Sequence, residues 1–351
     1  MRSELSELQF TMTGSAGRYA ELAAAVRSFK ADLTSEEQIE RIIESGSLSE
    51  TIGQLTRGQL AFGDNADLVP VEDFLIQKVI LLATSLTGYA PYDSRNLIRL
   101  VSRRYEFDCM KQILKSTIDQ IEPEEAMRQI SPAGKFSADR CKELIEARNP
   151  NRVVDALEDD NLKRIVSSKL TEKNAKQVIA SVDQYYYGKL WSASNLPDPL
   201  DAQSARGLIG EFIDQLNVLL ALRAKLVGLD SRTTSDMMIP INYALGKAFV
   251  EVAEASNFTN AMRVIDKTQY SGAFQNLSAS DGNIADVERA LKHRHAQSCF
   301  NAFAGSPFNV GLALALLFLK DYELHDLFSV INGKANNVAS DRITESLILR
   351  S

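Results

Sequence analysis

The sequence has 351 residues, of which 45% are hydrophobic, and 46 acidic against 39 basic residues give a formal net charge of -7. This length indicates about two domains with sizeable cores, and an acidic chain without a long basic run argues against sequence-independent binding to nucleic acid. Because no apolar run approaches the roughly 18 residues of a membrane span, any membrane association has to be peripheral.

The N-terminal stretch 1–15 shows no hydrophobic period and is expected to be a leader, without the apolar core of a signal peptide. The three cysteines, Cys109, Cys141 and Cys299, are widely spaced and odd in number. This usage favours a reducing cytosol over a disulfide framework.

The first helix is expected from near Gly17 to Leu33, since Tyr19, Leu22 and Val26 recur at helical spacing. Two short helices should follow. Thr34 with Glu37, and Ser47 with Glu50, have the spacing of a capping box, in which a side-chain oxygen accepts from a backbone N–H three residues on. The first short helix should bury the three isoleucines that follow its cap, Ile39, Ile42 and Ile43.

Further helices are expected along the rest of the chain. Residues 63–70 are rich in turn formers, residues 74–87 are mostly apolar, and Pro91 suits the start of the next helical block. Val178, Val182 and the neighbouring tyrosines fall at helical spacing, and no Asn-Gly type hairpin separates two alternating runs. The fold class is therefore expected to be all-α.

The last stretch contains a helix that is apolar all round. Almost every residue from Val310 to Leu319 is apolar, which indicates burial, and ten residues span only about 15 Å of helix, too short for a membrane. The amphipathic pattern continues to Gly333, which is expected to end the helix. Ser340 is expected to cap a final helix whose buried side is Ile343, Leu347 and Ile348.

An internal repeat with a period of about 105 to 110 residues runs through the chain. Its first block is an apolar pair followed by an acid, as in Leu144-Ile145-Glu146, with a capping residue three positions later. The capping residues of the three copies are Ser47, Asn149 and Asn257.

A second block repeats with the same period. It consists of an acid with apolar residues four and eight positions later, and its three acids are Glu106, Asp214 and Glu323. Two patterns that share one period predict three homologous helical units, at 16–133, 134–245 and 246–351.

Six short motifs occur in order along the chain. They are Tyr19-Ala20-Glu21-Leu22, Asp183-Gln184-Tyr185-Tyr186-Tyr187, Ile213-Asp214-Gln215-Leu216-Asn217, Thr268-Gln269-Tyr270, Leu319-Lys320-Asp321-Tyr322-Glu323-Leu324-His325-Asp326-Leu327 and Ile331-Asn332-Gly333-Lys334. Together these motifs resemble the C subunit, also called the d subunit, of the A-type and V-type rotary ATPases. The resemblance covers nearly the whole chain from about residue 16, and its weight comes from the order and spacing of the motifs. The Thr-x-Tyr motif at 268–270, in the third unit, does not recur in the other two units.

The resemblance implies a funnel of three helical units around a pseudo-threefold axis. It also implies a non-catalytic rotor subunit that links the central shaft to the membrane proteolipid ring and transmits torque. Such a subunit lies on the cytoplasmic face of the membrane, held there by protein contacts, as part of a membrane complex. The choice of ion belongs to other subunits of such a machine, and the resemblance fits both ATP synthesis and ATP hydrolysis.

Six charged residues are candidates for partner contacts. The alternative for the acids is a solvated or ion-paired structural role, and helix-terminal lysines often only complement the helix dipole. The tyrosines at 185–187 are interpreted as core. The candidates are Glu106, Asp214, Arg223, Lys225, Glu323 and Lys334.

No catalytic, cofactor-binding or metal-binding residue is expected. His293 and His295 point about 200° apart on a helix, and the pair His295 and Cys299 lacks further ligands. Each Gly-Lys pair lacks the other residues of a phosphate-binding P-loop, so no direct nucleotide binding is expected. A helical-repeat scaffold unrelated to rotary ATPases remains as the alternative, and an all-α enzyme acting through His295 as a third.

Overall fold

The computed structural model describes residues 14–60, 68–170, 174–274 and 283–350. In these ranges the regular elements are helices, with one isolated bridge between Ala133 and Phe136 and no strand, so the all-α prediction is confirmed. The leader predicted at 1–15 and the turn-rich segment at 63–70 fall largely outside the described residues.

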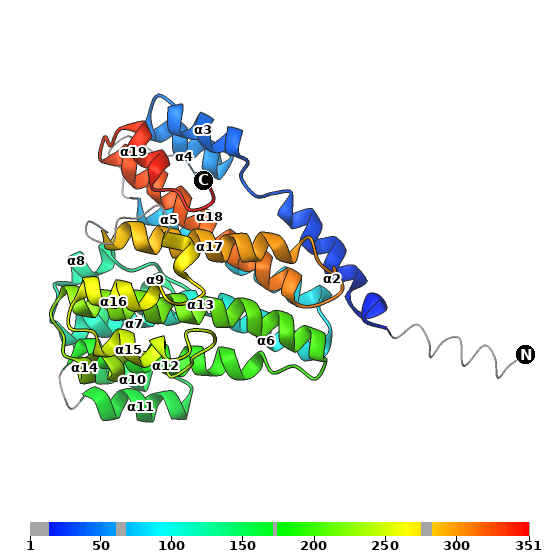
Figure 1. The fold of residues 1–351 in the computed structure, drawn as a ribbon. Helices are drawn as coiled ribbons and strands as arrows, with labels where there is room; N and C mark the ends of the chain where they lie inside the picture. Colours follow the sequence, from blue (N-terminus) through cyan, green and yellow to red (C-terminus); the bar gives the residue numbers. More distant parts are fainter. Residues whose placement is uncertain (1–13, 61–67, 171–173, 275–282, 351) are drawn as a thin grey trace, which may run out of the picture.

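The helices follow one another as short and long elements (Figure 1). In chain order they are α2 Ser15–Lys30, α3 Glu36–Glu44, α4 Leu48–Thr56, α5 Val69–Tyr89, α6 Tyr92–Ser102, α7 Arg104–Ile118, α8 Pro123–Arg128, α9 Ala138–Glu146, α10 Pro150–Asp155, α11 Asp160–Leu170, α12 Ala175–Ala193, α13 Pro199–Leu226, α14 Ser231–Met237, α15 Ala248–Glu254, α16 Phe258–Ile265, the 3-10 turn η1 Ser271–Phe274, α17 Ile284–Ala302, α18 Gly311–Ala335 and α19 Ser340–Glu345.

Three long helical segments form the centre of the molecule: α6 with α7, then α13, and then α18. The apolar first half of α18 is buried without interruption from Gly311 to Leu319, as its composition predicts. Burial of so many leucines supplies a large apolar contribution, at roughly 25 cal/mol per Å² removed from water. The first halves of the three long segments therefore pack into the main core.

Each long segment packs against the short helices that follow it. Helix α7 contacts α9 and α10, and α13 contacts α15 and α16. Helix α18, near the end of the chain, contacts α3 and α4 from its beginning instead, and Figure 1 shows these short helices beside α19. Their shared core joins Ile42 and Ile52 to Leu327 and Ile331, so the two ends of the chain build one cluster.

The repeat caps lie where the sequence predicts. Ser47, Asn149 and Asn257 are the N-caps of α4, α10 and α16, and each side chain accepts a hydrogen bond from a backbone N–H of the first turn. The prediction for α3 was wrong by one residue, because Ser35 with Gln38 forms the capping box.

Two predicted helix boundaries in the last unit were also wrong. Gly333 lies inside α18, where a Cβ atom would come within 2.6 Å of Ile343 Cγ1, so the glycine makes room for α19. The left-handed residue after the helix is Asn337, with φ of 55°. Ser340 is the first residue of α19, whose N-cap is Ala339.

A helix that spans a membrane has to be both long and apolar. Within the described ranges no helix meets both conditions.

Candidate functional site

A cavity of about 710 Å³ lies between the three long segments. It is lined by the start of α7 and by the second halves of α13 and α18, with side chains from α12 and α17 completing the wall. The first halves of α13 and α18 are packed in the core, so the cavity belongs to one end of the long helices.

An ion pair marks the inner end of the cavity. The Arg104 guanidinium pairs with Asp321, and the Tyr105 hydroxyl donates to the same carboxylate at 2.9 Å. The guanidinium also lies 5.6 Å from the centre of the Phe212 ring. Burial opposes the charge on Arg104, but Asp321 together with Tyr105, Tyr187 and Asp108 more than compensates and holds the pKa of the guanidinium well above its usual value. The inner end is thus closed by a partly buried charged contact between α7 and α18.

Further ion pairs lie along the wall of the cavity. Lys111 Nζ lies 2.8 Å from an Asp108 oxygen and 2.6 Å from an Asp183 oxygen, and these carboxylates raise its pKa against the effect of burial. On the other side Arg223 and Lys292 both pair with Glu288. Burial alone would raise the pKa of Glu288, but the two cations lower it below its usual value.

The carboxylates of Asp108, Asp183, Glu288 and Asp321 each lie in an ion pair with a cation. Burial raises the pKa of Asp183 above its usual value, although Lys111 acts to lower it. Apolar side chains such as Leu216 and Phe328 lie between them. The cavity wall is thus a mixture of paired charges and apolar side chains.

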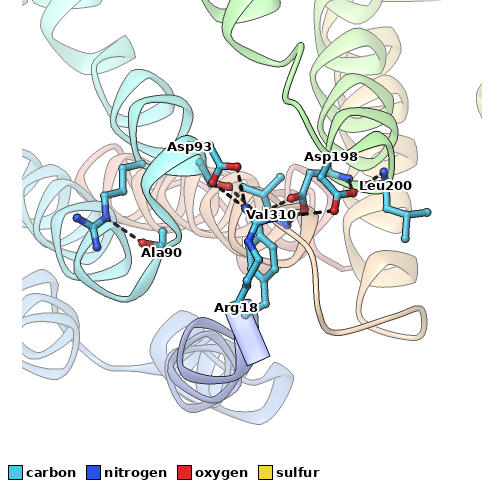
Figure 2. Close-up of polar contacts among 10 residues, drawn as sticks. Arg18, Ala90, Asp93, Asp198, Leu200 and Val310 are labelled. Atoms are coloured by element: carbon cyan, nitrogen blue, oxygen red, sulfur yellow. Dashed lines mark hydrogen bonds and ion pairs between the residues drawn. The ribbon is translucent and has the colours of Figure 1, made fainter. Parts of the chain in front are cut away.

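The opposite end of the long segments is joined by polar contacts, which Figure 2 shows. The Arg18 guanidinium of α2 lies 2.7 Å from Asp93 at the start of α6 and 4.0 Å from Asp198, the N-cap of α13. Asp198 in turn accepts from the Leu200 N–H at 2.9 Å.

A buried chain of hydrogen bonds lies behind Arg18. The Tyr19 hydroxyl donates to Asp201 at 2.6 Å and lies 2.6 Å from Ser94 Oγ, so the serine donates to the tyrosine. The other Asp201 oxygen accepts from the Val310 N–H at 2.9 Å. Burial raises the pKa of Tyr19, and Asp201 adds to this effect, so the hydroxyl stays protonated. We call Arg18, Tyr19 and their partners the clasp, because it ties α2 to the starts of all three long segments.

Of the six partner-contact candidates, Arg223 lies on the lining of the cavity between the three long segments. Asp214 is fully buried and accepts from the Tyr243 N–H at 3.1 Å, the Ala244 N–H at 2.8 Å and the Tyr270 hydroxyl at 2.7 Å. The Thr-x-Tyr motif thus meets a repeat acid through its tyrosine.

The other four candidates are separated from the cavity. Glu106 pairs with Arg103 at 2.8 Å and Lys225 is buried. Glu323 accepts from the N–H and hydroxyl of Thr34 at 2.6 and 2.7 Å, and Lys334 donates to the Ser45 carbonyl at 2.5 Å. The structure therefore does not bring the six together, and their contacts with partners stay a prediction.

Sequence reasoning missed the charged residues of the clasp and, apart from Arg223, those of the cavity. A signal for Asp321 was present, since it interrupts a buried apolar run, and a charge at such a position requires a partner. Arg104, Lys111 and Asp201 had no comparable signal, because their partners lie 217, 72 and 182 residues away.

His295 has a structural environment. Its Nε2 lies 2.9 Å from the Leu208 carbonyl, which only accepts, so Nε2 carries the proton and Nδ1 accepts from the Tyr322 hydroxyl at 2.7 Å. Burial lowers the pKa of His295 below its usual value. In the described part of the chain no group of three or more His, Cys, Asp or Glu side chains is placed to hold a metal ion.

Comparison with known proteins gives consistent matches. The profile of the family described as ATP synthase (C/AC39) subunit matches residues 22–346. A protein of Methanocaldococcus jannaschii, named as the C subunit of an A-type ATP synthase, is 23% identical, over 94% of this chain and 86% of its own length. Proteins of the same name from Methanosphaera stadtmanae and Pyrococcus horikoshii are 24% and 21% identical, over 93% and 92% of this chain and 86% and 88% of their own lengths.

Proposed function

This chain belongs to the ATP synthase (C/AC39) subunit family, and on that premise we propose that it is a non-catalytic rotor subunit of an A/V-type ion-translocating ATPase or ATP synthase. In this role it links the central shaft to the membrane proteolipid ring and passes torque between them. Its relatives are named as the C subunit of A-type ATP synthase, which supports a place in such a machine.

The observation that carries the proposal is the symmetry of the cavity lining. Arg104, Phe212 and Asp321 each stand two positions before a repeat acid, and they meet at the inner end of the cavity. The positions two and five residues after the acids line its wall in all three copies, as Asp108, Leu216 and His325, and as Lys111, Leu219 and Phe328.

Equivalent positions of a repeat meet in this way when the copies surround a common axis. This supports a pseudo-threefold funnel with the cavity as its open side. The sequence units 16–133, 134–245 and 246–351 remain part of the proposal. In the structure the short helices that pack against each long segment come from a different one of these units, since α7 contacts α9 and α10, α13 contacts α15 and α16, and α18 contacts α3 and α4.

We assign the two ends of the funnel to two partners. The cavity has charged walls and an exposed apolar side chain at its lining, Val227 with 66% exposure, which suits the foot of a protein shaft. At the other end Tyr92 and Leu200 are 88% and 61% exposed beside the clasp. Exposed tyrosine and leucine next to turns suit contact with the proteolipid ring, and the chain then lies peripherally on the cytoplasmic face of the membrane.

Site-specific photocrosslinking tests both the role and the orientation. A photoreactive phenylalanine replaces Val227, Tyr92 or, as a control on the outer face of α15, the 53% exposed Val250. The tagged chain is crosslinked in its native membranes and the products are identified by mass spectrometry. We expect a shaft protein at position 227, a proteolipid at position 92 and neither at position 250.

Each other outcome has a defined meaning. An exchange of the two partners would reverse the orientation and keep the rotor role. Crosslinks to soluble proteins alone, with a rotary ATPase that purifies without this chain, would replace the proposal with the helical scaffold.

A further inference from the structure

A second cavity, of about 940 Å³, lies beside α18 and under α3 and α4. Apolar side chains of α5 and α18 form much of its lining, including Leu75, Val79 and Leu324. Its size is within the range of small-molecule sites. We call it the lateral cavity. Its lining also carries four cationic side chains, Arg41, Arg57, Lys78 and Lys320.

The carboxylates of the lateral cavity do not balance these cations. Its lining has two of them, and Glu323 is already engaged by Thr34 and by Lys320 at 2.8 Å. Lys78 and Arg57 form no ion pair with any described carboxylate, and Lys78 Nζ lies 4.3 Å from the centre of the Phe74 ring.

Lys78 lies exposed on the cavity lining, as does Arg57, and its charge has no carboxylate partner among the described residues. Burial, together with Arg57 and Lys320, lowers the pKa of Lys78 below its usual value. Arg41 pairs with Glu37 and Lys320 with Glu323, so Arg57 and Lys78 make up the surplus of positive charge, although the chain as a whole carries a net charge of -7. An anion in the cavity would relieve the repulsion.

The corresponding place beside α7 provides an internal comparison. A smaller cavity of about 300 Å³ is lined there by the repeat acid Glu106, as the lateral cavity is lined by Glu323. Its cations have acidic partners: Arg103 pairs with Glu106, Lys135 with Glu158 and Lys189 with Asp159. A cavity beside a repeat acid therefore does not need unpaired cations. Of these two cavities, only the lateral cavity has cationic side chains without a described ion-pair partner.

We propose that the lateral cavity is a binding site for a phosphate group carried by an amphiphile, with Arg57 and Lys78 holding the phosphate and the apolar wall of α5 and α18 holding the adjoining chain. Guanidinium and ammonium groups bind phosphate oxygens by charge-assisted hydrogen bonds. Leu81, on the same lining and 63% exposed, continues the apolar wall to the surface. The site is independent of the proposed rotor role.

Calorimetric titration of the purified full chain tests the site. The probes are dihexanoylphosphatidylglycerol, whose phosphate group is anionic, dihexanoylphosphatidylcholine, which is zwitterionic, and inorganic phosphate. The test variant combines Arg57→Gln and Lys78→Gln. The matched control combines Lys135→Gln and Lys189→Gln, which removes the same charge from the smaller cavity. Thermal unfolding checks that both variants are folded.

We expect the phosphatidylglycerol to bind with one site per chain and the phosphatidylcholine to bind at least 10-fold more weakly. The test variant should lose at least 10-fold in affinity and the control variant less than 2-fold. Inorganic phosphate binding as tightly as the lipid would keep the site and assign it to free phosphate.

Two results would overturn the proposal. One is equal binding by the wild-type chain and the test variant, or no binding by either. The other concerns Asp64 and Asp67, which lie outside the described residues. If lipid binding arises only when both are replaced by Asn, the acids of the chain itself neutralise the cavity.

Discussion

Replacement of Asp214 by alanine should be among the most destabilising single changes in this protein. The carboxylate is fully buried and serves two backbone N–H groups and the buried hydroxyl of Tyr270. A hydrogen bond to a charged group contributes about 1.5–3 kcal/mol, so three of them contribute roughly 4.5–9 kcal/mol before other costs.

Desolvation of the carboxylate reduces this figure. Burial raises the pKa of Asp214 above its usual value even though Tyr270 and the N–H groups of Ala244 and Tyr243 act to lower it. The free-energy cost of burying the charged carboxylate is therefore larger than the stabilisation that the three donors give to its charged form over its neutral form. We expect Asp214→Ala to lower the free energy of unfolding by about 3–5 kcal/mol, and Asp214→Asn, which keeps an acceptor oxygen without the charge, by about 1–2 kcal/mol.

Urea unfolding followed by circular dichroism measures both values. Glu106→Ala is the matched control, because Glu106 occupies the same repeat position but makes a partly exposed ion pair with Arg103. Glu106→Ala should lower the free energy of unfolding by less than about 1 kcal/mol. A loss below about 1 kcal/mol for Asp214→Ala, or equal losses for the alanine variants of the two acids, would refute the reasoning.

Three more measurements test other contacts. The pKa of His295 is lowered by burial, so the unfolded chain takes up the proton first; the stability that the neutral ring contributes is present above the ordinary pKa of about 6.5 and is lost as the pH falls below it. The decline in melting temperature between pH 7 and pH 5 should therefore be shallower in His295→Gln, and an unchanged decline would contradict this. Gly333→Ala should cost about 1–3 kcal/mol in urea unfolding, because the added methyl meets Ile343 at 2.6 Å; a neutral effect would show that α19 moves freely. Tyr19→Phe removes the donor to Asp201 in the clasp and should lower the free energy of unfolding by about 1.5–3 kcal/mol. Hydrogen exchange in α2 should also become faster, and unchanged exchange there would contradict the clasp.

Features determined by neighbouring residues could be predicted from the sequence. Ser47, Asn149 and Asn257 cap their helices because a cap needs only a side-chain oxygen and the N–H groups of the next turn. The apolar run from Val310 to Leu319 likewise indicated its own burial.

Features that depend on distant residues could not be predicted from the sequence. Thr34 has the sequence of a cap, but Glu323 accepts its hydrogen bonds from 289 residues away, and Ser35 caps the helix instead. Gly333 looks like a helix end until Ile343 is packed against it. The pairing of Arg104 with Asp321 joins residues 217 positions apart, and no local sequence pattern indicates which distant residue such a charge meets.

The joining of α18 to α3 and α4 has a consequence for biosynthesis. The isoleucines of the first short helices share a core with α5 and with the leucines and isoleucines of α18, a helix that is translated long after them. At roughly 5–20 residues per second, the N-terminal helices wait many seconds with part of this core uncovered. The first third of the nascent chain is thus a natural client for chaperones, and a message truncated before α18 would yield a product that aggregates or is degraded.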